Sequence, residues 1–244
     1  MTRRAQQPRR DCVFLVADKT MGDTFTGFFQ RSDVSARLGC GAFSFDPALD
    51  LIVAEGGGDP GVFDRAHQFL ACYRPSHDHA LVALDAAWDS EKNATGGNRQ
   101  LQNARRVQMQ MGKRLRRSWR DRFQVVVIDP ELEAWVWQDH PEVAKTLGWK
   151  SSFPLRQWMA DRGDWPLSDA KPWDPKAAMK AVVLETNEPW SSALHKRIVS
   201  RVPVDACVDT AFDTLRGAFQ RWFPPTADAA SVISGSAAAH TRLT

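Results

Sequence analysis

The sequence lacks any run of about 18 apolar residues, the length at which a segment becomes a candidate for a membrane-spanning helix. Its basic first residues, MTRRAQQPRRDC, also lack the apolar stretch that a signal peptide needs. Together, these two absences predict a cytoplasmic protein with no membrane partner.

Cysteine is scarce, and none of the four cysteines belongs to a CxxC pair. Three of them lie in apolar segments, which favours reduced thiols in the core and argues against a zinc site. The four are Cys12, Cys40, Cys72 and Cys207.

An excess of charge of one sign is also missing, because 32 Lys and Arg residues against 29 Asp and Glu residues leave a net charge of +3. This balance excludes a chain that is basic throughout. It still permits nucleic-acid binding wherever the basic residues cluster on one surface.

What the sequence does contain is four short runs of continuously apolar residues, separated by segments with helical character. The runs are residues 12–17, 49–55, 79–86 and 124–129. Continuous rather than alternating apolar runs are typical of parallel strands that helices cover on both faces. The sequence therefore predicts an α/β fold of Toprim-like type, with a parallel sheet of about four strands flanked by helices and an α-helical C-terminal extension.

The change in composition along the chain divides it into four parts. Residues 1–11 are expected to be a flexible basic segment, and residues 12–138 the α/β domain. Residues 139–225, in which Trp and Pro are frequent, are expected to form the helical extension. The small and polar residues 226–244 predict a disordered tail.

Carboxylates follow three of the four predicted strands. In an open parallel sheet, functional groups gather beyond the carboxyl ends of the strands, so these side chains are expected to meet there. Clustered carboxylates repel one another, and a hard cation such as Mg²⁺ or Mn²⁺ relieves that repulsion. Each residue taken alone is better explained as the cap of the helix that follows, and only the joint pattern points to a site. The carboxylates in question are Asp18, Asp85, Asp89, Asp129, Glu131 and Glu133.

The order of these acids resembles a known family. An acidic residue after the first strand and two aspartates after the third resemble the Toprim domain of topoisomerases, primases and overcoming-lysogenization-defect nucleases. The segment VVVIDPELEAWVW is similar to a Toprim-like family of bacterial defence islands. The longer series DPGVFDRAHQFL, HALVALD, KPWDPKAAM, PWSSAL and FDTLRGAFQRWFP is similar to a component of methylation-associated phage-defence systems.

The resemblance implies a catalytic site with a divalent cation. Asp18 would be a metal ligand or general base, Asp85 and Asp89 metal ligands, and Glu131 or Glu133 would complete the shell. Two departures from the family pattern are plain. Asp18 stands where Toprim domains usually have Glu, and Asp85 and Asp89 are spaced DxxxD rather than DxD.

These features leave two functional hypotheses. The first is a metal-dependent nuclease, or a related phosphodiester-processing subunit, that acts on DNA together with other proteins of the same defence system. The second is a non-catalytic scaffold or interaction subunit of a multiprotein defence complex, which the two departures favour. A third, weaker idea is metal-dependent binding of a nucleotide without cleavage.

Two further segments carry charge near the predicted site. A long helix at about residues 98–120 has basic side chains on one face, including Arg106, Lys113 and Arg120, which indicates either a phosphate-contacting surface or a solvated face. Lys176, in KPWDPKAAMK, is interpreted as a basic approach to the acids or as a solvated side chain. The GGGD turn that ends at Asp59 lies beside the proposed site.

Overall fold

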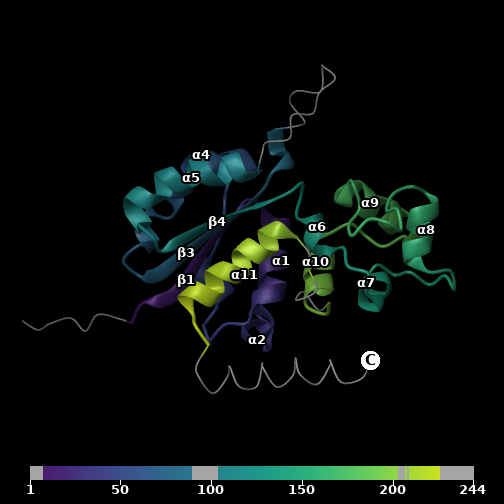
Figure 1. Cartoon of the computed structure of the whole chain (residues 1–244), viewed down its shortest axis with the longest axis horizontal. Helices are drawn as coiled ribbons and strands as arrows, with labels where there is room; N and C mark the ends of the chain where they lie inside the picture. Colours follow the sequence, from purple (N-terminus) through teal and green to yellow (C-terminus); the bar gives the residue numbers. More distant parts are fainter. Residues whose placement is uncertain (1–7, 90–103, 203–206, 208, 226–244) are drawn as a thin grey trace, which may run out of the picture.

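Four parallel strands form a single sheet in the order β2-β1-β3-β4. A computed structural model describes residues 8–89, 104–202, 207 and 209–225 of the chain (Figure 1). The strands are β1 (Arg10–Val16), β2 (Leu51–Val53), β3 (His77–Asp85) and β4 (Phe123–Ile128). The predicted α/β class with a four-stranded parallel sheet is therefore confirmed, and the topology is consistent with a Toprim-like fold.

The strands form where the apolar runs are buried on both faces. Residues 12–16 of β1 are fully buried, and so are residues 80–84 of β3. In the register, Phe14 of β1 lies between Leu51 of β2 and Leu81 of β3. β2 is shorter than predicted because the residues before it form α3 (Pro47–Asp50), whose N-terminus the Asp46 side chain caps.

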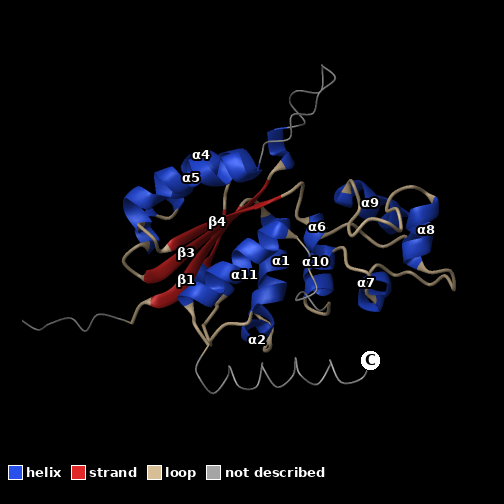
Figure 2. Cartoon of the chain, viewed as in Figure 1, coloured by secondary structure: helices blue, strands red, loops and turns tan. Residues whose placement is uncertain are grey.

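Helices cover both faces of the sheet, as Figure 2 shows. α4 (Gly58–Phe69) and α5 (Ala104–Trp119) lie on one face, and α1 (Lys19–Phe29) and α11 (Thr210–Trp222) lie on the other. The predicted helix at about residues 98–120 corresponds to α5. Its first predicted residues, 98–103, lie outside the described part of the chain. The predicted terminal segments also lie largely outside the described residues.

The remaining helices connect and extend these layers. Short elements lie around the sheet: α2 (Val34–Leu38), η1 (Ala71–Tyr73), η2 (Ala87–Asp89) and α6 (Glu133–Val136). The later part of the chain adds α7 (Pro141–Thr146), α8 (Leu155–Asp161), α9 (Pro175–Thr186) and α10 (Ser192–Val199). Among the described residues, no helix has both the length and the apolar character needed to cross a membrane.

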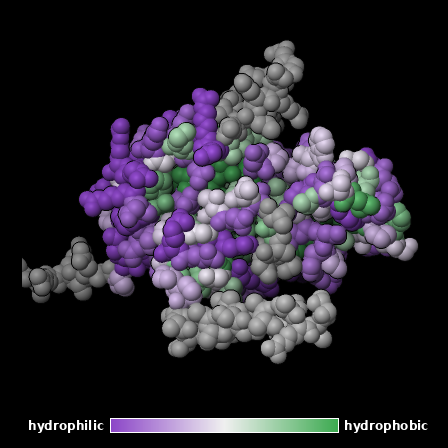
Figure 3. All heavy atoms as spheres, in the orientation of Figure 1, coloured by the Kyte–Doolittle hydropathy of each residue, from purple (hydrophilic) through white to green (hydrophobic). Residues whose placement is uncertain are grey.

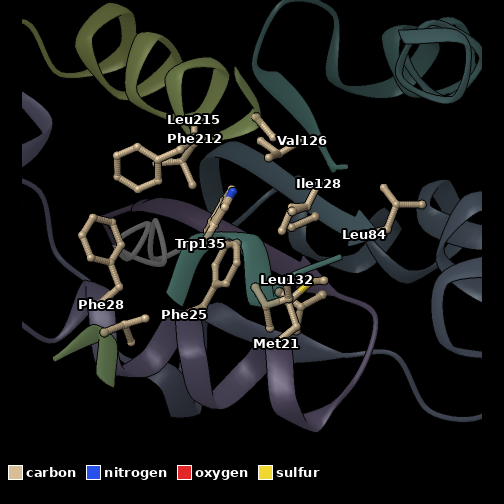
Figure 4. Packing of buried hydrophobic residues seen from close by; sticks show 14 of the residues in the cluster. Met21, Phe25, Phe28, Leu84, Val126, Ile128, Leu132, Trp135, Phe212 and Leu215 are labelled. Atoms are coloured by element: carbon tan, nitrogen blue, oxygen red, sulfur yellow. The ribbon is translucent and has the colours of Figure 1, made fainter. Parts of the chain in front are cut away.

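An aromatic core joins the late helices to the sheet. Figure 4 shows Trp135 between Phe25 of α1 and Phe212 of α11, and the ring centroids are 5.9 Å and 5.4 Å from that of Trp135. Phe219 of α11 contacts Phe14 of β1 at 6.1 Å between ring centroids. The helical residues after position 138 therefore include α11, which packs against one face of the sheet.

α1 and α10 approach closely at Gly27. A methyl group at this position would lie 2.7 Å from the backbone oxygen of Lys196 and 3.0 Å from a methyl group of Val199. Because the first contact is with backbone, the two helices must move apart to admit a side chain. Glycine is needed here for packing and not for a turn.

We expect Gly27→Ala to destabilise the protein by about 1 to 3 kcal/mol, the usual cost of overpacking. Gly112→Ala in α5 is the matched control, because its new methyl group would find no atom closer than 3.9 Å. In a helix with free space, alanine is favoured over glycine by about 0.5 to 1 kcal/mol. Urea unfolding of both variants measures the difference, and a Gly27→Ala protein as stable as wild type would contradict the close approach.

Candidate functional site

The end of β3 lies against the start of α4. Asp85 is the last residue of β3, and its backbone N–H donates a hydrogen bond of 2.8 Å to Oδ1 of Asp59. Asp59 reaches this position through a turn in which Gly56, Gly57 and Gly58 all have positive φ, at 62°, 144° and 51°. Such φ values favour glycine strongly, so the GGG sequence is what allows the Asp59 carboxyl to face the end of β3.

The Asp85 side chain is partly buried, and one of its two carboxyl oxygens lacks a hydrogen bond. Its Oδ1 is shielded from solvent and has no hydrogen-bond partner among the described residues. Burial raises the pKa of Asp85 well above its ordinary value, and the nearby charge of Asp59 raises it further. Smaller contributions in the same direction come from Glu133, Glu131 and Asp18. Acids from three other segments of the chain therefore act on this side chain.

Asp18 both caps a helix and contributes to the acidic cluster. It follows β1, and its Oδ1 accepts a hydrogen bond of 2.8 Å from the backbone N–H of Met21 in the first turn of α1. Its charge also helps to raise the pKa of Asp59, for which burial is the largest cause. The capping role and the site role, which the sequence left as alternatives, are thus compatible for this residue.

Backbone hydrogen bonds hold the two glutamates beside the end of β3. The N–H groups of Ala86 and Ala87 donate to the carbonyl oxygen of Pro130, at 3.2 Å and 3.0 Å. This tie fixes the segment that carries Glu131 and Glu133. Burial raises the pKa of Glu131, although the positive charge of Lys176 opposes the rise.

Two basic side chains face these glutamates. Nζ of Lys176 lies 3.4 Å from Oε1 of Glu131. Burial alone would lower the pKa of Lys176, but the charges of Glu131 and Glu133 raise it overall. Nε2 of His195 lies 3.4 Å from Oε1 of Glu133. Burial acts to raise the pKa of Glu133, whereas the hydrogen bond and charge of His195 leave it lowered.

The structure does not place every predicted site residue. The backbone of Asp89 lies in η2, but its side chain is outside the described part of the molecule. Asp129 follows β4, and burial followed by the charge of Asp209 raises its pKa. Asp129 is not among the acids that act most strongly on Asp85.

We call Asp18, Asp59, Asp85, Glu131 and Glu133 the acidic cluster. Its donors are all hard oxygens, which suit Mg²⁺ or Mn²⁺, and the buried Oδ1 of Asp85 lacks a partner. Within the described residues, no three Asp, Glu, His or Cys side chains are close enough to enclose a metal ion.

Three residues in or beside the acidic cluster have only weak signals in the sequence, or none. From the sequence, Asp59 is placed only beside the site, and Lys176 is interpreted either as a basic approach to the acids or as a solvated side chain. His195 was not singled out, because SALHKRIV predicts only a helix after the cap Ser191. The sequence signals available were the GGGD turn for Asp59 and the KPWDP helix start for Lys176.

The comparisons with known proteins give no independent evidence of function. No family model, no curated protein and no solved structure matches the chain. The resemblance to Toprim domains therefore stays a prediction, and the function must be argued from the acidic cluster itself.

The raised pKa of Asp85 predicts how stability depends on pH. A carboxyl whose pKa is higher in the folded than in the unfolded state stabilises the fold fully below its unfolded pKa, and this contribution is lost as the pH rises through the folded pKa. The cause here is burial of the charged form. Asp85→Asn removes that charge, so the melting temperature of the variant relative to wild type should rise as the pH increases from about 4, the ordinary pKa of Asp, toward the raised folded pKa.

Thermal unfolding at several pH values, without divalent cations, measures this difference. Asp64→Asn is the control, because the Asp64 side chain is 67% exposed. A difference between wild type and Asp85→Asn that stays constant over the whole pH range would contradict the burial of the Asp85 charge.

Proposed function

We propose that this chain is a component of bacterial anti-phage defence and that it processes phosphodiester bonds of DNA with Mg²⁺ or Mn²⁺. The observation that carries the proposal is Oδ1 of Asp85, which is shielded from solvent and has no hydrogen-bond partner among the described residues. Burial and the surrounding carboxylates both disfavour its charge. A bound cation would supply the missing partner and offset the repulsion.

The acidic cluster divides into ligands and supporting groups. Asp85 and Asp59 would hold the cation, because Asp59 already accepts a hydrogen bond from the backbone of Asp85. Glu133 is paired with His195, which keeps its carboxylate charged and oriented. Asp89 is a further proposed ligand. The remaining proposed ligands are Asp18 and Glu131.

A phosphate is the substrate group that this arrangement favours. The cation would neutralise charge on the phosphate oxygens during cleavage. Lys176 carries a positive charge at the edge of the cluster, where its Nζ can donate to a second phosphate oxygen in place of Glu131. The choice of DNA, and of other defence proteins as partners, is supported only by the resemblance of the sequence segments.

The test is cleavage of labelled DNA by the purified chain, alone and with the proteins encoded beside it. We expect cleavage of single-stranded or duplex DNA in Mg²⁺ or Mn²⁺, and none in EDTA. Cleavage that is equal in EDTA and in Mg²⁺ would contradict the metal-dependent site, and so would inactivity on all DNA forms with every partner present.

A non-catalytic role in a defence complex is the second candidate. Several large apolar side chains of the helical part are exposed, with Leu184 exposed to 83% and Trp173 to 80%. Figure 3 shows apolar atoms at the surface over the region of α8 and α9. Co-purification with a partner that Asp85→Ala leaves unchanged, together with no cleavage, would favour this role.

A further inference from the structure

A basic groove runs beside the edge strand of the sheet. It has a volume of about 620 Å³ and is lined by α5, the first residues of β4 and one residue of α11. β4 is the last strand in the sheet order, so the groove borders an unpaired edge. In Figure 1, α5 and α11 lie on opposite sides of β4. The charged residues in its lining are Arg105, Lys113, Arg116, Arg120, Asp121 and Arg221.

The positive charge of this groove is not neutralised within the described part of the chain. There, Arg105, Lys113, Arg116 and Arg120 are exposed and form no ion pair. Arg221 donates a hydrogen bond of 3.0 Å to the neutral side chain of Gln124. The single acid in the lining cannot balance five cations, so the groove presents net positive charge.

Other cations of the same helix are used differently. Arg114 lies over the ring of Phe63, at 4.8 Å from its centroid, and donates to the Phe63 carbonyl oxygen. This side chain fastens α5 to α4. The cations that line the groove do not hold one helix against another in this way. Like charges four residues apart on a helix also destabilise it slightly. Their arrangement is therefore explained better by an anionic ligand than by the fold.

The spacing of the cations suits an extended polyanion. Lys113 and Arg116 are three residues apart in α5, about 4.5 Å along the helix axis, and Arg120 follows directly after the end of the helix. Met109, which is 54% exposed, and Phe123 give the same groove an apolar surface. Cations that follow a backbone, next to side chains on which bases or sugars can pack, are typical of nucleic-acid-binding grooves.

We propose that this groove binds the sugar-phosphate backbone of a nucleic-acid strand. β4 leads from the groove at Phe123 to Ile128, a distance of about 17 Å over five residue steps. The acidic cluster lies beyond that end of the sheet. A strand seated in the groove can extend along β4 toward the cluster, so the repulsive carboxylates do not have to bind it alone. The inference rests on the proposed function for the choice of nucleic acid over other polyanions.

Binding can be measured without cleavage, by fluorescence anisotropy of a labelled 20-nucleotide DNA strand in EDTA. We expect Arg116→Glu to raise the dissociation constant about tenfold and to reduce the salt dependence by about one phosphate contact. Lys150→Glu, an equal charge change at an exposed site outside the groove, should alter binding much less. Lys113→Glu provides a second groove variant, and circular dichroism checks that each variant is folded.

The outcomes separate this inference from the proposed cleavage activity. The proposal that the groove binds nucleic acid would be overturned if Arg116→Glu and Lys150→Glu weakened DNA binding equally. It would also be overturned if both groove variants bound DNA as wild type does. Either result would hold even if Asp85-dependent cleavage is found. Loss of binding confined to the groove variants supports it even if no cleavage occurs. Competition by poly-glutamate as strong as that by an oligonucleotide of equal charge would overturn the choice of nucleic acid.

Discussion

Replacing Asp85 by Asn should reduce metal-dependent DNA cleavage by a factor of at least about 100, because the variant loses a charged oxygen ligand at the centre of the acidic cluster. The change keeps the size of the side chain. It also keeps the backbone N–H that donates to Asp59, so the turn before α4 should stay in place. The loss should therefore reflect the site and not the fold.

A measurement of metal binding distinguishes loss of the cation from loss of the cleavage step itself. In wild type, Mg²⁺ or Mn²⁺ should raise the melting temperature, because a ligand that binds only the folded state stabilises it. Asp85→Asn should show little or no such rise, whereas the exposed Asp64→Asn should behave as wild type in both assays. Full cleavage by Asp85→Asn, or an equal metal-induced shift in both proteins, would refute the proposed site.

Replacing Phe219 by Ala should destabilise the protein by about 3 to 5 kcal/mol, the usual cost of truncating a buried Phe. Phe219 is fully buried and contacts aromatic rings from three parts of the chain. The rings are those of Phe14 in β1, Phe29 in α1 and Phe43 in the loop before α3. Removing the side chain leaves a cavity that these rings cannot fill without moving.

Urea unfolding followed by circular dichroism measures this loss. Phe153→Ala is the matched control, because the same truncation at a side chain that is 44% exposed should cost about 1 kcal/mol or less. Equal losses of stability in the two variants would contradict the packing of α11 against the sheet through Phe219. A single unfolding transition in wild type is expected, since the late helices share their core with the sheet.

The fold could be predicted largely from the sequence because its strongest signals are local. Continuous apolar runs at residues 12–17 and 79–86 indicated parallel strands covered on both faces, and β1 and β3 lie there. The boundaries were less accurate. The run at 49–55 includes residues that form α3, because capping by Asp46 favours a helical turn before β2.

The sequence by itself determined which carboxylates stand at strand ends, because strand ends are marked by where apolar runs stop. It therefore identified Asp18 and Asp85 as members of one edge of the sheet. Only the tertiary structure decided which side chains face them. Asp59 reaches Asp85 across 26 residues, Lys176 reaches Glu131 across 45, and His195 reaches Glu133 across 62.

Such partners are set by how helices pack on the sheet, and a one-dimensional pattern does not contain that packing. The same holds for the basic groove. The sequence shows that α5 is basic, but only the position of α4 on one side and the open edge of β4 on the other decides which of its cations are engaged and which remain available. Local propensity sets the elements, while burial and long-range packing set the electrostatic surroundings in which their side chains act.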